Sequence, residues 1–311
     1  MKKKVMFLIL IIPSVFQAQK MSWENEKVSV HLNQKSHTLL DASSLYKDRW
    51  DILPQAMFWK EIMLLSPDSC IINVASSRKI LDKTSLKQWA GQTENQKTAF
   101  KDSLRCLYNL ASDERIFITS GKNDFYRFNE VFPTISQGVR AFERLGVDPW
   151  YAQAILLIES PAQLKKSTVG AYGPFQLMPS VARSHGLTVT EQVDERADFE
   201  RSAYAASQLI KTVCIPEAKK ILNKQGIVAN ESDLWFRLFV LHVYHAGASN
   251  VQAVVAKIKP VNGSQELIKQ MWQTTAGGFG NNSQNYSQLA LAAQLILEEL
   301  VNTLCDDLSA R

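Results

Sequence analysis

Residues 150–159 form an almost wholly apolar stretch that ends in one carboxylate, Glu159. On a helical wheel Ala152, Ile155, Leu156 and Glu159 lie on one stripe, and Gln153 is the only other polar residue of the stretch. A helix of this composition is buried on most of its sides. We therefore expect the carboxyl group of Glu159 to lie in or near the core.

Two effects raise the pKa of a carboxyl group in this position. Desolvation disfavours the charged form, and so does the negative partial charge at the C-terminal end of a helix. We expect Glu159 to be largely protonated near neutral pH, as a general acid must be if it protonates the leaving oxygen of a glycoside. The alternative is a structural carboxylate that accepts hydrogen bonds from backbone N–H groups of the next segment.

The segment after this helix has the composition of a ligand-binding loop. Gly170 and Gly173 permit a positive φ or a close approach of a ligand to the backbone. Gln176 offers both a donor and an acceptor, and Phe175 and Met178 supply apolar contact surface. The alternative is that Phe175 and Met178 simply pack in the core.

Four motifs together resemble the soluble lytic transglycosylase (SLT) type of peptidoglycan lyase, which is related in fold to goose-type lysozyme. The motifs are "IES" at 158–160, "STVGAYGPFQLMP" at 167–179, "VYHAGASNV" at 243–251 and "NYSQLA" at 285–290, and they follow the family's order. The resemblance implies a lysozyme-like helical catalytic domain with Glu159 as its only catalytic acid/base.

The resemblance also implies a reaction and a set of binding residues. Glu159 would protonate the glycosidic oxygen between N-acetylmuramic acid and N-acetylglucosamine, and then deprotonate the muramic acid 6-hydroxyl, which closes to a 1,6-anhydro product. No second acid stands out beside Glu159, so the 2-acetamido group of the substrate would serve as the internal nucleophile. No cofactor or metal is implied. The implied substrate-binding residues are Ser167, Gly173, Phe175, Gln176, Met178, Tyr244 and Tyr286.

Two other functions are compatible with the sequence. One is a muramidase that hydrolyses the same bond with water. The other is a non-catalytic protein that binds the cell wall, because the chain departs from the family's pattern at Pro174, His245 and Asn282. His242 and His245 lack an acidic or cysteine partner at ligand spacing, so we expect no metal site.

The elements that position these residues are predicted to be helices. Asp148 followed by proline is a helix start, and Gly247 is a helix stop. A long amphipathic helix is predicted over 194–215, ending before Pro216. We expect 131–311 to form the transglycosylase domain and the fold class to be mainly α.

Residues 19–130 carry no chemical motif and are predicted to form an accessory region that is mostly helical. Residues 19–45 are polar and are expected to be an extended lead-in. Helical spacing is found over 50–65 and 98–111. The segments "SCIINVA" and "RIFITSG" could each be a short strand.

The first 18 residues predict a secretory signal peptide. Three lysines precede an apolar run over 5–16, which is too short to span a bilayer, and Ala18 offers a small residue for cleavage. No cysteine lies near this junction, so a lipoprotein is not expected. We expect an exported protein of the periplasm or cell envelope that acts on the glycan strands of peptidoglycan.

Composition and cysteine content are those of an ordinary globular protein with a sizeable core. The chain has 311 residues, of which 46% are hydrophobic and 21% charged. Removal of residues 1–18 would reduce the formal charge from +5 to +2, so charge gives no reason to expect a nucleic-acid partner. The four cysteines allow either two disulfides, in three pairings, or free buried thiols. They are Cys70, Cys106, Cys214 and Cys305.

Overall fold

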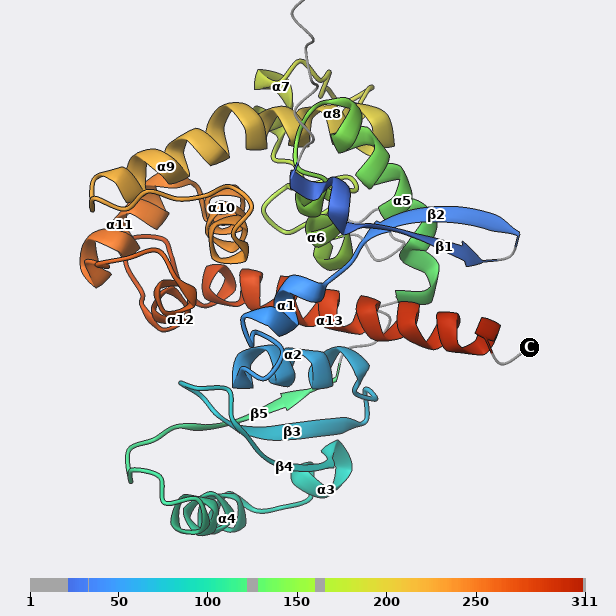
Figure 1. Cartoon of the computed structure of the whole chain (residues 1–311). Coiled ribbons are helices and arrows are strands. Elements are labelled where there is room, and N and C mark those ends of the chain that lie inside the picture. The colour runs from blue at the N-terminus through green and yellow to red at the C-terminus, as the bar shows by residue number, and fades with distance from the viewer. Residues whose placement is uncertain (1–21, 33, 122–127, 160–165, 310–311) are drawn as a thin grey trace, which may run out of the picture.

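The computed structural model describes residues 22–32, 34–121, 128–159 and 166–309 (Figure 1). Helices make up most of this part of the chain, and the strands in it form two small antiparallel sheets. The mainly α fold class predicted from the sequence is confirmed. The predicted signal peptide lies outside the described residues. No helix within the described ranges has the length and apolar character that crossing a membrane requires.

The N-terminal segment is a hairpin and not the extended lead-in that its polarity suggested. A short 3₁₀ helix, η1 (Ser22–Glu26), leads into strands β1 (Lys27–Leu32) and β2 (Lys35–Leu40), which pair antiparallel. Strand β2 packs against helix α5 (Phe128–Arg144). The polar composition did not predict these strands, because hydrogen bonds between the backbones of β1 and β2 stabilise the exposed end of the hairpin without apolar side chains.

A small lobe follows the hairpin and lies below helix α13 in Figure 1. The segment "SCIINVA", which could be a strand from its sequence, contains the central strand of a three-stranded sheet with the order β4-β3-β5. The segment "RIFITSG", also a possible strand, contains one of its edges. Ile72, Val74, Leu81, Leu104 and Ile116 form a separate small core beneath it. Helix α1 (Ser43–Lys47) precedes this lobe, and its Leu45 belongs to the main core. The elements of the lobe are α2 (Pro54–Leu64), β3 (Ser69–Val74), β4 (Ile80–Ser85), α3 (Leu86–Ala90), α4 (Glu94–Leu107) and β5 (Ile116–Ser120).

The rest of the chain is helical. Helix α6 lies at its centre, and α13 crosses the molecule between these helices and the small lobe (Figure 1). After α5 the elements are α6 (Trp150–Glu159), α7 (Pro179–Ser184), η2 (Glu195–Ala197), α8 (Phe199–Leu209), η3 (Ile210–Cys214), α9 (Ile215–Asn223), α10 (Leu234–Ala246), α11 (Ala248–Ile258), α12 (Gln265–Gln273) and α13 (Asn281–Ser309).

Most of the predicted helix signals act as expected, and one does not. Asp148 accepts a hydrogen bond from the Trp150 N–H (2.9 Å) and so caps α6. Gly247 ends α10 with a φ of 80°. The helix predicted to end before Pro216 instead continues, because a π-helical turn, η3, joins α8 to α9. Pro216 then stands in the first turn of α9, where proline is tolerated.

The main core is built around α6. Every residue from Trp150 to Ile158 is buried, and the absence of a side chain at Gly138 in α5 lets Leu156 approach closely. This core also takes in side chains between positions 30 and 63, which lie in the region assigned above to the accessory part. The helix that ends in Glu159 is thus enclosed by both halves of the chain.

Three of the four cysteines have described side chains, and all three are free thiols. Cys70 and Cys214 are buried, while Cys106 is exposed. Burial raises the pKa of the Cys214 thiol to about 12, so this thiol is an apolar core group rather than a reactive one. The side chain of Cys305 lies outside the described residues.

Candidate active site

Glu159 is the last residue of α6, and its side chain opens onto a pocket of about 220 Å³. The residue as a whole is partly accessible because one side of it faces this pocket. Glu159 is the only carboxylate among the described lining residues. The others are Ser167, Val169, Ala171, Gln176, Leu177, Met178, Val181, Leu209, Tyr244 and His245.

The carboxyl group of Glu159 is desolvated by the surrounding core. This desolvation raises the pKa of Glu159 to about 7, and an interaction with the side chain of Tyr286 opposes the rise in part. The direction is the one expected from the sequence. With a pKa near 7 both protonation states of Glu159 are accessible at neutral pH, so the same group can donate a proton and later accept one.

Two tyrosines flank this carboxyl group in different ways. The Tyr286 side chain is buried, and its hydroxyl makes no hydrogen bond of normal length and angle to any described residue. Its side chain nonetheless interacts with Glu159 and lowers the pKa of that group. The Tyr286 ring stacks on the imidazole of His245, with centroids 4.3 Å apart. The Tyr244 hydroxyl instead donates a 2.6 Å hydrogen bond to the carbonyl oxygen of Phe175.

The loop over 167–178 forms one wall of the pocket and is closed by its own hydrogen bonds. The Ser167 Oγ accepts from the Ala171 N–H (2.9 Å), and Tyr172 and Leu177 exchange two backbone hydrogen bonds. Gln176 has a φ of 45°, an uncommon conformation for a residue with a side chain. Its Nε2 donates to the Gly173 carbonyl (3.0 Å), which holds the side chain at the pocket wall.

A buried arginine, Arg196 in η2, fastens this loop to the rest of the domain. Its Nη1 donates to the carbonyl oxygens of both Gly170 and Leu177, each at 2.8 Å. Its Nε and Nη2 bind the two carboxylate oxygens of Asp194 at 2.8 and 2.7 Å. This hydrogen bonding to Arg196 is the main reason why the pKa of Asp194 is lowered. Gly173 lies against the backbone of Arg196, and a Cβ there would overlap its carbonyl oxygen.

Sequence reasoning did not find Arg196. Asp194 is the first residue of the helix predicted over 194–215, and it caps η2 by accepting from the Arg196 N–H (3.2 Å). The available signal was an arginine two residues after that aspartate. Its significance depends on contacts with carbonyl groups 19 and 26 residues away, which no local pattern reveals.

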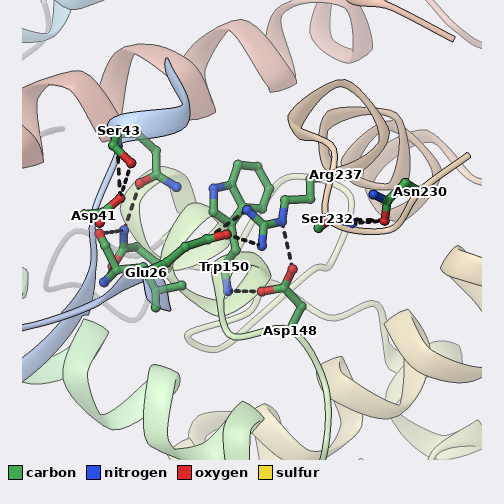
Figure 2. A network of polar contacts seen from close by, with 11 residues as sticks. Glu26, Asp41, Ser43, Asp148, Trp150, Asn230, Ser232 and Arg237 are labelled. Atoms are coloured by element: carbon green, nitrogen blue, oxygen red, sulfur yellow. Dashed lines mark hydrogen bonds and ion pairs between the residues drawn. The ribbon is translucent and has the colours of Figure 1, made fainter. Parts of the chain in front are cut away.

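A second buried network holds the other end of α6 (Figure 2). The Arg237 side chain is fully buried, and its Nε donates to Asp148 Oδ2 at 2.8 Å. Its Nη1 and Nη2 bind the carboxylate of Glu26 at 2.9 and 3.1 Å. The guanidinium group also lies 5.6 Å from the ring centroid of Trp150. This network joins the start of α6 to α10 and to η1.

Four of the seven predicted binding residues line the pocket with Glu159: Ser167, Gln176, Met178 and Tyr244. The other three do not line it. The side chain of Phe175 is fully buried and stacks on Phe142 with centroids 5.5 Å apart, because the tight turn at Gly173 directs it into the core. Gly173 faces Arg196, and Tyr286 lies behind Glu159 in the core.

The two histidines of α10 differ, since His245 lines the pocket and His242 packs in the core. His242 is fully buried, and burial lowers its pKa to about 3. Its Nε2 is hydrogen bonded to the Ser287 Oγ (2.8 Å), which also accepts from the Trp272 Nε1 (2.7 Å). Across the described ranges, no three histidine, cysteine or acidic side chains cluster in a way that could hold a metal ion.

Comparison with known proteins gives one match. Residues 140–265 match the family model described as the transglycosylase SLT domain. This range contains Glu159, the loop over 167–178 and Tyr244, and so it covers three of the four motifs that carry the resemblance. No curated protein and no solved structure was found to match the chain.

Proposed function

Because the chain contains an SLT domain, the lysozyme-like helical domain of the peptidoglycan lytic transglycosylases, we propose that Glu159 is its sole acid/base and that it forms 1,6-anhydro ends. The bond cleaved is that between N-acetylmuramic acid and N-acetylglucosamine in the glycan strand. The observation that carries this proposal is that Glu159, the one carboxylate among the described residues of the pocket wall, has a pKa raised to about 7 by desolvation.

In this proposal one side chain performs two proton transfers. Protonated Glu159 first donates its proton to the glycosidic oxygen as the bond to the anomeric carbon breaks. The carboxylate, now charged, then accepts the proton of the muramic acid 6-hydroxyl as that oxygen closes onto the anomeric carbon. A pKa near neutrality suits both steps.

The absence of a second carboxylate on the described pocket wall favours a substrate-assisted route. Most retaining glycosidases place a second carboxylate about 5–5.5 Å from the acid as a nucleophile. Here the described lining offers hydroxyl, amide, imidazole and apolar groups besides Glu159. In our proposal the 2-acetamido group of the substrate attacks its own anomeric carbon and stabilises the intermediate.

The four predicted binding residues on the pocket wall are proposed to contact the sugar. Gln176 and Ser167 offer polar groups to the sugar, and Met178 and Tyr244 offer apolar surface. Tyr286 lies behind Glu159, and in this proposal its role is to set the protonation of that group. Gly173 and Phe175 build the wall and do not touch the sugar.

Export is part of the same proposal, since the substrate lies outside the cytoplasm. The basic and apolar pattern of residues 1–18 supports a secretory signal peptide. The protein would then act in the periplasm or cell envelope. N-terminal sequencing of the protein recovered from the envelope fraction tests this, and a chain that still begins at residue 1 would contradict it.

The reaction is tested by mass analysis of fragments released from purified peptidoglycan. We expect muropeptides whose muramic acid ends are lighter by one water than hydrolytic ends, and no release by Glu159→Gln, which keeps the shape of the side chain. Fragments with ordinary reducing ends would indicate a muramidase. If wild-type protein releases no fragments and Glu159→Gln binds glycan equally well, the protein is a cell-wall-binding protein and not an enzyme.

A further inference from the structure

A larger cavity, of about 650 Å³, lies between the small lobe and the start of α13. The small lobe contributes the turn after β3, at 75–78, and the segment over 113–117. The helical part contributes the end of α12 and the first turns of α13. All the described residues that line this cavity lie outside the range 140–265 that matches the SLT domain.

Arg78 is the unusual residue of this cavity. Its backbone has a φ of 61°, a conformation that is rare for arginine and costs free energy. Its guanidinium lies near the rings of Phe58 and Trp59, 5.3 and 5.9 Å from their centroids. Its Nη2 donates to the Oδ1 atoms of Asn281 and Asn285 at 3.4 and 3.2 Å.

The charge of Arg78 has no carboxylate partner in the described part of the chain. The side chain is half-buried, and desolvation lowers its pKa. Arg196 and Arg237, the two fully buried arginines of the described ranges, each bind a carboxylate directly. A partly desolvated cation without an anion is unfavourable, so an anionic ligand in the cavity would stabilise it.

The remaining polar groups of the cavity carry charge of both signs. Arg115 is exposed, and its guanidinium lies 5.0 Å from the ring centroid of Phe117. Glu114 accepts a 2.8 Å hydrogen bond from the Ser76 hydroxyl, and Asp113 lies beside it on the rim. The cavity therefore matches a polar ligand that has both carboxylate and amino groups.

We propose that this cavity binds the peptide stem of peptidoglycan, with Arg78 and Arg115 binding its carboxylates and Glu114 binding its amino group. The identity of the ligand rests on the function proposed above. Where the lactyl carboxyl group of each muramic acid is amide-linked to its stem, the glycan is uncharged and would leave Arg78 without an anion, whereas the stem peptide carries charge of both signs. Helix α13 links the two sites, since Tyr286 contacts Glu159 while Asn281 and Gln284 line this cavity.

The test is calorimetric titration of the full-length protein with a free synthetic stem tetrapeptide that contains a diamino acid. Replacement of Arg78 or Arg115 by glutamine should weaken peptide binding about tenfold or more, the usual effect of losing a hydrogen bond to a charged group. The affinity for chitotetraose, which has no charge, should stay unchanged in both variants. Arg144→Gln, at an exposed ion pair with Glu200, is the matched control and should bind the peptide like wild type.

Wild-type affinity in both Arg78→Gln and Arg115→Gln, or no binding of the peptide to the wild-type protein, would overturn the proposal. If Arg78→Gln does not fold, Arg115→Gln decides the matter, because its side chain is exposed and makes no described ion pair. Binding is measured without turnover. If the protein binds the peptide through these arginines but releases no anhydro fragments, the proposed reaction is wrong and the proposed peptide site still stands.

Discussion

Replacement of Glu159 by glutamine should stabilise the protein at high pH. In the folded protein, desolvation raises the pKa of Glu159 from its ordinary 4.5 to about 7. Below pH 4.5 the group is protonated in both the folded and the unfolded chain, so its titration does not affect stability. Between these two values the unfolded chain loses the proton that the folded chain keeps, and the free energy of unfolding falls as the pH rises.

The magnitude follows from the two pKa values. Each pH unit between them corresponds to about 1.4 kcal/mol, so ionisation of Glu159 should cost the folded state about 3 kcal/mol above pH 7. Glutamine has nearly the same shape and stays neutral. We therefore expect Glu159→Gln and wild type to have similar free energies of unfolding at pH 4, and the variant to be more stable by about 3 kcal/mol at pH 8.5.

The assay is urea unfolding followed by circular dichroism at a series of pH values from 4 to 8.5. Glu191→Gln serves as the control, because Glu191 is exposed and its replacement relieves no desolvation. A stability difference between Glu159→Gln and wild type that is the same at every pH would refute the reasoning. Such a result would mean that the carboxyl group is solvated in the folded protein.

Three further predictions concern the groups around Glu159. The rate of fragment release should fall as the pH rises through about 7, because Glu159 then loses the proton that it must donate. Tyr286→Phe should move this fall to higher pH, because Tyr286 lowers the pKa of Glu159. A pH–rate profile that is the same in Tyr286→Phe and wild type would contradict this. Arg196→Met removes the guanidinium group that binds Asp194 and the carbonyl oxygens of Gly170 and Leu177, so it should lower the free energy of unfolding by about 3–5 kcal/mol, against little change for Arg144→Met in urea titrations. Gly173→Ala should destabilise the protein more than Gly170→Ala does, because both have a positive φ but only Gly173 faces a backbone atom that a Cβ would overlap; equal melting temperatures for the two variants would argue against this packing.

The features that were predictable from the sequence are those with local causes. The cap at Asp148, the stop at Gly247 and the burial of α6 depend on residues within one or two turns of each other. The raised pKa of Glu159 was also predictable, because an apolar helix necessarily carries its terminal residue into the core. The sequence alone did not decide whether "SCIINVA" forms a strand, since its flanking residues do not distinguish a strand from a helix.

The errors arose where one segment meets another. Residues 27–40 looked like a lead-in until pairing between β1 and β2 was known. Pro216 looked like a helix end, but the π-helical turn before it lets the helix continue. The sequence left open whether Phe175 packs in the core, and its burial and stacking on Phe142 are seen only in the fold.

The sequence by itself determined that a carboxyl group, Glu159, ends a buried helix, because hydrophobic periodicity acts along one element. The tertiary structure alone decided what surrounds that carboxyl group. Tyr286 reaches Glu159 from α13, and Arg196 fastens the loop from η2. The cavity at Arg78 joins segments about 200 residues apart. Contacts of this kind depend on how helices and strands pack against one another across the core. Such packing between distant segments produces no periodic pattern in the sequence from which it could be predicted.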